Sequence, residues 1–154
     1  MKRMRLLAAL ALLACVAAPI QALAAPCVVK PSDNRVISET IRSLYAALAK
    51  DEALDGIVSP GFYAFEGDKR FTGSELSAVI RQTHAKGVTL VWKLDTIDIH
   101  AGCDVAWAAW ENHGAAIDAS GSKPVTWYES AGLHRDGARW VIDFLHAHRV
   151  NVPK

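Results

Sequence analysis

The hydrophobic period of this chain changes once, and that change limits the folds that the chain can adopt. In the helical segments expected before Gly87, apolar residues recur every three or four positions, as they do on the buried face of a helix. From Val88 to Val150 they recur at every second position, as they do along half-buried strands. Helices therefore come first and an antiparallel meander follows. This order predicts an α+β fold with the helices on one face of the sheet.

Three helical segments are expected before the change. Ser32 or Asp33 can cap the first, and a short second piece is expected over 51–56. The chain then forms a hairpin, with strands at 62–65 and 70–71 around a turn at 66–68. The third helix begins at a capping box, Thr72 to Glu75, and stops at Gly87. The first helix buries the apolar positions Ile37, Ile41, Leu44, Tyr45 and Leu48.

Four long strands are expected after Val88. Within the first of them the apolar phase slips near Asp95, which predicts a bulge or sharp bend and therefore a strongly curved sheet. The other three strands are expected over 105–112, 125–134 and 139–150, with a loose connection at 119–122.

The first 24 residues have the order of a secretory signal: a basic start, an apolar stretch and an Ala22-Leu-Ala24 cleavage site. We expect residues 25–31 to be a lead-in and 32–150 to be one domain, periplasmic or secreted. The alternative is a lipoprotein anchored at Cys15. Removing the signal leaves 14 basic against 16 acidic residues, a net charge near −2, which argues against nucleic acid as a partner. No second apolar run is long enough for a membrane span.

The signal leaves two cysteines, Cys27 and Cys103, in a compartment that permits disulfides. A bond between them is the natural pairing, and closing so long a loop would stabilise the fold by about 4 kcal/mol. The alternative is that Cys27 lies in a loose N-terminal tail and Cys103 in an ordinary turn.

The closing part of the chain resembles a known family. The segments Thr126-Trp-Tyr-Glu-Ser130 and Arg135-Asp-Gly-Ala-Arg-Trp140-Val-Ile-Asp-Phe-Leu-His146 are similar to the last hairpin of many nuclear transport factor 2-like proteins. With the order of the elements before them, they make the chain look like a SnoaL-like member of that superfamily. The resemblance implies a cone-shaped sheet wrapped on a long helix, a pocket at the open end, and often a dimer through the other face of the sheet.

Strand parity places two titratable side chains inside such a cone. On the last strand Trp140, Ile142, Phe144, His146 and His148 share one side, and on the strand before it Trp127, Glu129, Ala131 and Leu133 do. A Glu129/His146 pair is the best candidate for general acid–base catalysis, because a carboxylate can orient an imidazole beside a substrate. The alternative is that the pair only fills a polar gap in the core.

Aromatic side chains are the stronger signal for a ligand. Trp92, Trp107 and Trp127 are expected on the inner wall, where such side chains bury apolar molecules or simply build the core. Tyr45 matches the helix tyrosine of the superfamily's steroid isomerases, but Ala64, Phe65 and Glu66 provide no clear inward aspartate. The other ligand-binding candidates are Phe62, Phe144 and His148.

The remaining expectations concern metals and partners. His146 and His148 point the same way and could ligate a metal, but the pattern is weak, so we expect no metal and no cofactor. The side chains of these strands that point away from the cone are expected to form an apolar outer patch. Paired about a two-fold axis, this patch would form a homodimer interface. Its residues are Trp110, Tyr128, Val141 and Leu145.

Three functions remain open from the sequence. The first is an exported domain that binds a small, partly apolar molecule in its cone. The second is a cofactor-free lyase, cyclase or hydrolase that uses the Glu129/His146 pair. The third is a structural dimerisation module that acts through the outer sheet face.

Overall fold

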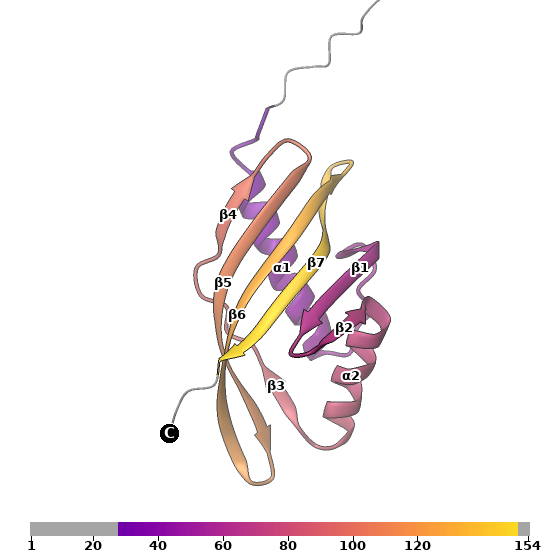
Figure 1. The fold of residues 1–154 in the computed structure, drawn as a ribbon, viewed down its shortest axis with the longest axis vertical. Helices are drawn as coiled ribbons and strands as arrows, with labels where there is room; N and C mark the ends of the chain where they lie inside the picture. Colours follow the sequence, from indigo (N-terminus) through magenta and orange to yellow (C-terminus); the bar gives the residue numbers. More distant parts are fainter. Residues whose placement is uncertain (1–27, 151–154) are drawn as a thin grey trace, which may run out of the picture.

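The computed structural model describes residues 28–150, and over this range the chain forms one curled sheet packed against helices (Figure 1). This confirms the predicted α+β fold. No helix of this range is long and apolar enough to cross a bilayer. The elements in chain order are α1 (Asp33–Ala49), β1 (Val58–Glu66), β2 (Lys69–Thr72), α2 (Gly73–Ala85), β3 (Thr89–Val91), β4 (Asp98–Ala101), β5 (Val105–Asp118), β6 (Gly121–Asp136) and β7 (Arg139–Val150).

The sheet has the strand order β2-β1-β7-β6-β5-β3, and β4 also pairs with β5. Its centre is a meander in which β5 pairs with β6 and β6 with β7, both antiparallel. One pairing differs from the expected antiparallel sheet, because β1 lies parallel to β7. The β1–β2 hairpin therefore joins the sheet as a unit beside the last strand of the chain.

The strands of the meander are longer than the sequence pattern indicated. β5 and β6 stay paired as far as Asp118 and Gly121, so the connection predicted to be loose is a tight turn at the tip of a long hairpin. Gly121 there has a φ of +122°, which side chains other than hydrogen rarely allow. Figure 1 shows this hairpin extending beyond the rest of the sheet.

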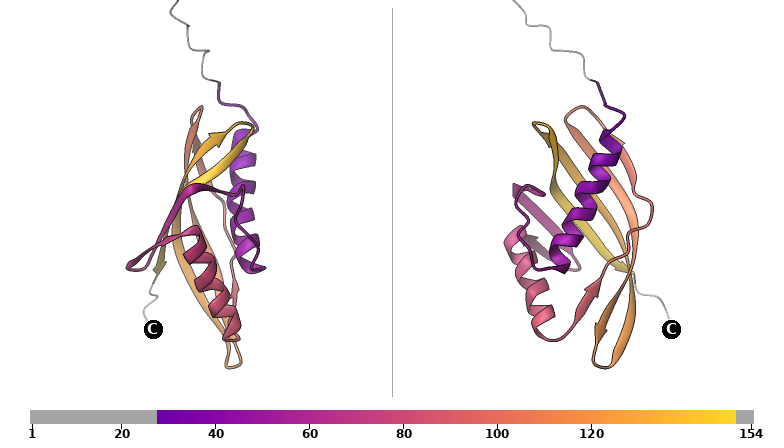
Figure 2. Two further views of the ribbon diagram at one scale, coloured as in Figure 1. Left: turned by 90° about the vertical axis from the view of Figure 1, so that its right-hand side faces the viewer. Right: turned by 180° about the vertical axis from the view of Figure 1, so that it is seen from behind.

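Helix α1 runs along the inner side of the curved sheet, as the two further views show (Figure 2). Its Ile37, Ile41 and Leu44 are completely buried, together with Trp140 and Ile142 of β7. The predicted buried stripe of this helix is therefore confirmed, and burial of these side chains is the main force that holds the helix on the sheet.

The start of α1 is held by Asp33 rather than by a side-chain cap. Ser32 occupies the cap position but makes no side-chain capping bond. The Asp33 carboxylate accepts hydrogen bonds from the backbone N–H of Lys30, from Arg135 and from the Trp140 indole, at 2.8, 2.8 and 3.2 Å. The hydrogen bond from Arg135 is the main reason why the pKa of Asp33 falls to about 2.

Two other helix predictions had different outcomes. The short helix expected over 51–56 is wrong, because this segment forms hydrogen-bonded turns in which Asp51 has a φ of +58°. The capping box of α2 is confirmed: Glu75 N–H donates to the Thr72 hydroxyl and Thr72 N–H donates to the Glu75 carboxylate.

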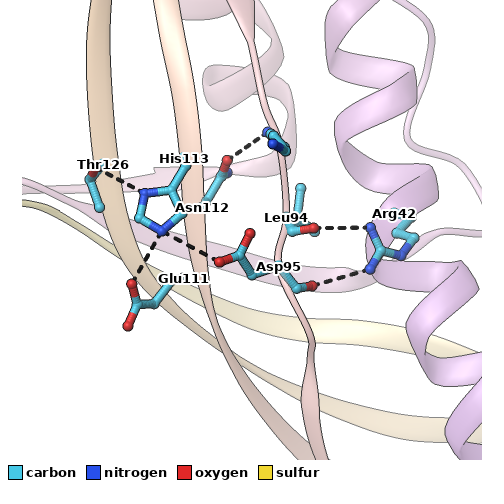
Figure 3. Close-up of polar contacts among 8 residues, drawn as sticks. Arg42, Leu94, Asp95, Glu111, Asn112, His113 and Thr126 are labelled. Atoms are coloured by element: carbon cyan, nitrogen blue, oxygen red, sulfur yellow. Dashed lines mark hydrogen bonds and ion pairs between the residues drawn. The ribbon is translucent and has the colours of Figure 1, made fainter.

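The break predicted near Asp95 is also confirmed. Between β3 and β4 the segment 92–97 leaves the regular ladder, although an isolated bridge joins Leu94 to Asn112 of β5. Figure 3 shows how this connection is fixed from both sides. Arg42 of α1 donates to the carbonyls of Leu94 and Asp95, at 3.4 and 3.2 Å. On the other side the Asn112 carbonyl oxygen accepts from the backbone N–H of Lys93 at 2.9 Å.

Candidate functional site

A polar cluster lies inside the curved sheet, and Glu129 of β6 is at its centre. The predicted inner side of β6 is confirmed, because Trp127, Glu129, Ala131 and Leu133 are all buried. Cross-strand register places Trp110 of β5 opposite Glu129. The Trp110 indole donates to Glu129 Oε2 at 2.6 Å and the Asn112 amide donates to the same oxygen at 2.9 Å.

Burial also changes the acidity of Glu129. It raises the pKa of this carboxyl, since the charged form loses its water, while the hydrogen bonds from Asn112 and Trp110 and the nearby Tyr45 hydroxyl oppose the change. The charge of Glu66 raises the same pKa further. A carboxyl in such surroundings can hold a proton at a higher pH than an exposed one, so it can donate as well as accept hydrogen bonds.

Tyr45 of α1 faces the same interior. Its hydroxyl is buried and has no hydrogen-bond partner of normal geometry within residues 28–150. Burial and then the neighbouring Glu129 charge raise its pKa well above 10. Its ring contacts Trp92 and Trp110, with centroids 5.7 and 6.3 Å apart. An unpaired buried hydroxyl costs free energy, so the cluster contains a donor that a bound molecule could satisfy.

A second carboxyl, Glu66, lies at the rim of this interior. It ends β1 on the inner side, in phase with the buried Phe62 and Ala64, and pairs in register with Ala147 of β7. Its side chain is exposed, yet the surrounding protein raises its pKa, against a hydrogen bond from Trp127 and the charge of Arg149. The sequence offered no clear inward aspartate here and Glu66 was not named as a site residue, although its even spacing from Phe62 was the signal that could have found it.

A groove on the surface shares Tyr45 with the cluster. It lies between α1 and the segment 90–94 and has a volume of about 520 Å³, within the range of small-molecule sites. Two of the predicted ligand-binding residues, Tyr45 and Trp92, line it. Arg42, which bridges α1 to the 94–95 carbonyls, stands at one side (Figure 3). Its apolar lining is completed by Ala46, Ala49, Leu90, Val91 and Leu94.

The predicted pairing of Glu129 with His146 is wrong. His146 and His148 are exposed on the outer face, whereas Leu145 and Ala147 are buried. A bulge in β7 is the cause: Ile142 pairs with Leu133 and Phe144 with Gly132, so Asp143 is an extra residue. One extra residue moves every later side chain to the opposite face. The inward phase therefore holds for Trp140 and Ile142 and reverses beyond them.

The metal alternative also depended on these two histidines. Both lie on the exposed face of β7. Over 28–150, no group of three or more His, Cys, Asp or Glu side chains is arranged to hold a metal ion. His113 does lie near Asp95 and Glu111, at 3.4 and 3.3 Å, but as a surface ion-pair cluster in which all three side chains are about half exposed (Figure 3).

On β5 the expected faces are reversed. Trp107, predicted to line the cone, is 53% exposed, and Trp110, predicted for the outer patch, is 5% exposed and inside. The two are three residues apart, so alternation places them on opposite faces but does not say which is inner. The small side chains Ala106 and Ala108 are buried in phase with Trp110 because α1 packs against that face.

The outer face differs from the prediction in other members too. Leu145 belongs to the main core, and Val141 is buried outside the core clusters, so of the predicted patch only Tyr128 is exposed. Phe144, predicted to face inward, lies outside beyond the bulge and contacts Tyr63, with centroids 5.1 Å apart. Phe62 is buried in the core as expected.

The predicted disulfide involves one residue outside the described range. Cys27 lies before residue 28, so its pairing with Cys103 stays a prediction, as do the signal peptide at 1–24 and the lipid-anchor alternative at Cys15. The Cys103 carbonyl accepts a hydrogen bond from Arg135 Nε at 2.8 Å, and Arg135 also binds Asp33. This arginine therefore links the turn of Cys103 to the start of α1, only six residues after Cys27.

Comparisons with known proteins agree on the fold. No family model and no curated protein matches the sequence. Among solved structures, a nuclear transport factor 2-like protein from Cytophaga hutchinsonii is 10% identical, with 77% of this chain and 98% of that chain covered and a TM-score of 0.64. A ketosteroid isomerase-like protein from Erwinia carotovora atroseptica is 14% identical, with coverages of 80% and 100% and a TM-score of 0.62.

A putative calcium/calmodulin-dependent protein kinase II association domain from Xanthomonas campestris is 15% identical, with coverages of 82% and 95% and a TM-score of 0.60. At identities this low the likeness concerns the fold alone. The chain therefore has the nuclear transport factor 2-like fold. The SnoaL-like assignment within it stays a prediction.

Proposed function

We propose that this chain binds a small, partly apolar molecule on the inner side of its curved sheet, through the groove between α1 and segment 90–94. The observation that carries the proposal is the unpaired, buried Tyr45 hydroxyl beside the buried Glu129 carboxyl. Tyr45 and Trp92 line the groove and provide the apolar contact. The buried Tyr45 hydroxyl and the Glu129 carboxyl beside it are the polar groups that we propose to orient the molecule.

The test is whether a molecule accompanies the protein. Protein purified from its native compartment should release one compound on denaturation, detected by mass spectrometry. Trp92→Ala should abolish its recovery, whereas Trp107→Ala, which removes the same residue type from the outer face, should keep it. Because Trp92 packs against core residues, Tyr45→Phe is the milder companion, and it should lower recovery without loss of fold. Equal recovery from all four proteins, or none from the wild type, would refute the proposal.

The enzymatic alternative needs a base next to Glu129, and no histidine of residues 28–150 takes that place. His146, the proposed partner, and His148 are exposed on the outer face. The other four histidines, at 84, 100, 113 and 134, contact Asp51, Trp107, Thr126 and Asp143 respectively. Binding rather than acid–base turnover is therefore the function that we propose for the interior.

A second candidate function, homodimerisation through the outer sheet face, is favoured by a row of aromatic side chains. Tyr63, Phe144, Gly132, Trp107 and His100 are register partners in succession across β1, β7, β6, β5 and β4. Trp107 stacks on His100 at 4.0 Å and is 53% exposed, and Phe65 beside the row is 42% exposed. An exposed aromatic face of this kind is typical of an interface.

The oligomeric state decides this second candidate. Light scattering after size exclusion should give a dimer for the wild type at micromolar concentration and a monomer for Trp107→Lys. Val79→Lys is the control, because Val79 is similarly exposed but lies on α2. A monomeric wild type would end the proposal.

We also propose that the mature chain is exported, on the support of the signal-like residues 1–24. The intact mass of protein from the periplasm or medium should show cleavage after Ala24. A mass that retains Cys15 with attached lipid would instead support the anchored alternative.

A further inference from the structure

A second, larger groove lies away from the interior. It has a volume of about 1020 Å³ and is formed by the turns at 53–56, the first half of β1, β2, the start of α2 and the β6–β7 hairpin. It shares no lining residue with the groove between α1 and segment 90–94. Binding to this second groove can therefore be tested separately from the proposed function.

An irregularity in β1 opens this groove. Val58 pairs with Ile142 and Tyr63 with Phe144, so four residues of β1 span the distance that one residue of β7 covers. The extra residues include Pro60, which has no N–H to donate, and Gly61, where an added Cβ would meet no atom within 4 Å. The chain thus arches away from β7. Ser59, which is only 9% exposed, lines the opening.

Three arginines from three different elements line the groove: Arg70 of β2, Arg81 of α2 and Arg139 of β7. Arg139 is paired with Asp136 at 2.8 Å. Its guanidinium also lies over Gly56, since a Cβ at this glycine would be 3.0 Å from Arg139 Nη1. The backbone at this position has a φ of +74°, which glycine adopts more easily than other residues. The missing side chain of Gly56 therefore leaves room for Arg139 beside the groove.

Arg70 and Arg81 are different, because neither forms an ion pair with any residue of the described range 28–150. Both are exposed, and Arg70 lies over the Tyr63 ring at 4.4 Å. Glu75, which feels the charge of Arg70, is already bound by Thr72 in the capping box. The acids that line the groove are Asp55 and Asp136, and Asp136 is taken by Arg139. Two guanidinium groups are thus left without a carboxylate partner.

We propose that this groove binds a small organic molecule carrying a phosphate group, held by Arg70 and Arg81. Guanidinium groups bind phosphate oxygens by paired, charge-assisted hydrogen bonds. A phosphate can accept from several donors around it, which suits arginines that approach from separate elements. Ser59 and Ser77 line the same space, and a volume of about 1020 Å³ holds much more than a free phosphate ion.

The test compares three probes by isothermal titration or by amide chemical shifts: phenyl phosphate, benzoate and inorganic phosphate. Phenyl phosphate should bind best. Benzoate shares its ring without the phosphate, and inorganic phosphate shares the anion without the ring. Arg70→Gln and Arg81→Gln should each weaken phenyl phosphate binding about tenfold, as expected for loss of a hydrogen bond between charged groups.

Arg35→Gln is the matched control, because it removes the same charge from an exposed ion pair on α1, and it should bind like the wild type. Thermal unfolding should be unchanged in all three variants, since the three side chains are exposed. The proposal is overturned if benzoate binds as well as phenyl phosphate, if no probe binds at millimolar concentration, or if Arg35→Gln weakens binding as much as the groove variants. Tyr45→Phe should leave this binding intact, so failure here would not affect the interior site.

Discussion

Replacing Glu129 tests whether the interior cluster is built as its hydrogen bonds indicate. Glu129 Oε2 accepts from both Trp110 and Asn112. Asn112 cannot rotate its amide to find another partner for its N–H group, because its carbonyl oxygen is bound to the backbone of Lys93. Glu129→Met, which keeps the length but removes the acceptor, therefore leaves two buried donors unpaired.

The cost of each unpaired buried donor is roughly 1–3 kcal/mol, so Glu129→Met should destabilise the fold by about 2–6 kcal/mol. Glu129→Gln keeps a carbonyl oxygen in the same place and adds an N–H₂ group. This group can donate a hydrogen bond to the unpaired Tyr45 hydroxyl oxygen. The glutamine variant should therefore fold at least as stably as the wild type near neutral pH. Chemical denaturation followed by tryptophan fluorescence measures both differences.

The raised pKa of Glu129 also predicts the direction in which the stability of the protein changes with pH. Burial raises the pKa of Glu129 above 4.5 in the folded protein, so folding favours its protonated form. This contribution to stability is complete below the unfolded pKa and is lost as pH rises through the folded pKa. The stability of the wild type relative to Glu129→Gln should accordingly fall as pH rises from about 4.5. A constant difference between pH 4 and 8, or a methionine variant as stable as the glutamine variant, would refute the reasoning.

Three further predictions concern the rest of the fold. The Arg135 hydrogen bond lowers the pKa of Asp33 to about 2, so its stabilisation is present above pH 3.8 and lost as pH falls toward 2; thermal unfolding curves of wild type and Asp33→Asn should converge there. Gly114→Ala should destabilise by about 3 kcal/mol in urea titrations, because its Cβ would overlap the backbone carbonyl oxygen of Val91 in β3; a neutral effect would contradict the β3–β5 packing. Non-reducing peptide mapping of mature protein should give one crosslinked peptide joining Cys27 to Cys103, and two free thiols would exclude that bond.

Much of the fold followed from local patterns, because local interactions build those parts. The stripe of α1 and the Thr72–Glu75 capping box need only helical geometry and a neighbouring side chain, and both were predicted. The break near Asp95 was visible as a slip in the apolar phase. The segment 51–56 was predicted as a short helix, since its helix-forming residues could not reveal that Asp51 adopts a positive φ.

The site could be predicted only in part. Glu129 was found as an acid in the apolar phase of β6, and Tyr45 and Trp92 were named as ligand contacts, and all three lie at the interior cluster or its groove. Asn112 and Glu66 were missed as site residues. Asn112 is in phase with Trp110, which had been placed on the wrong face.

The sequence by itself determined which residues share a face along each uninterrupted run of strand, and where helices give way to strands, since these depend on backbone geometry over a few residues. Only the tertiary structure decided which face of β5 is inner, because that depends on whether α1 packs against Trp107 or Trp110. It also decided that Asp143 is an extra residue in β7, because a bulge is defined by the pairing of two strands. That single unpaired residue turned His146 outward and separated it from Glu129.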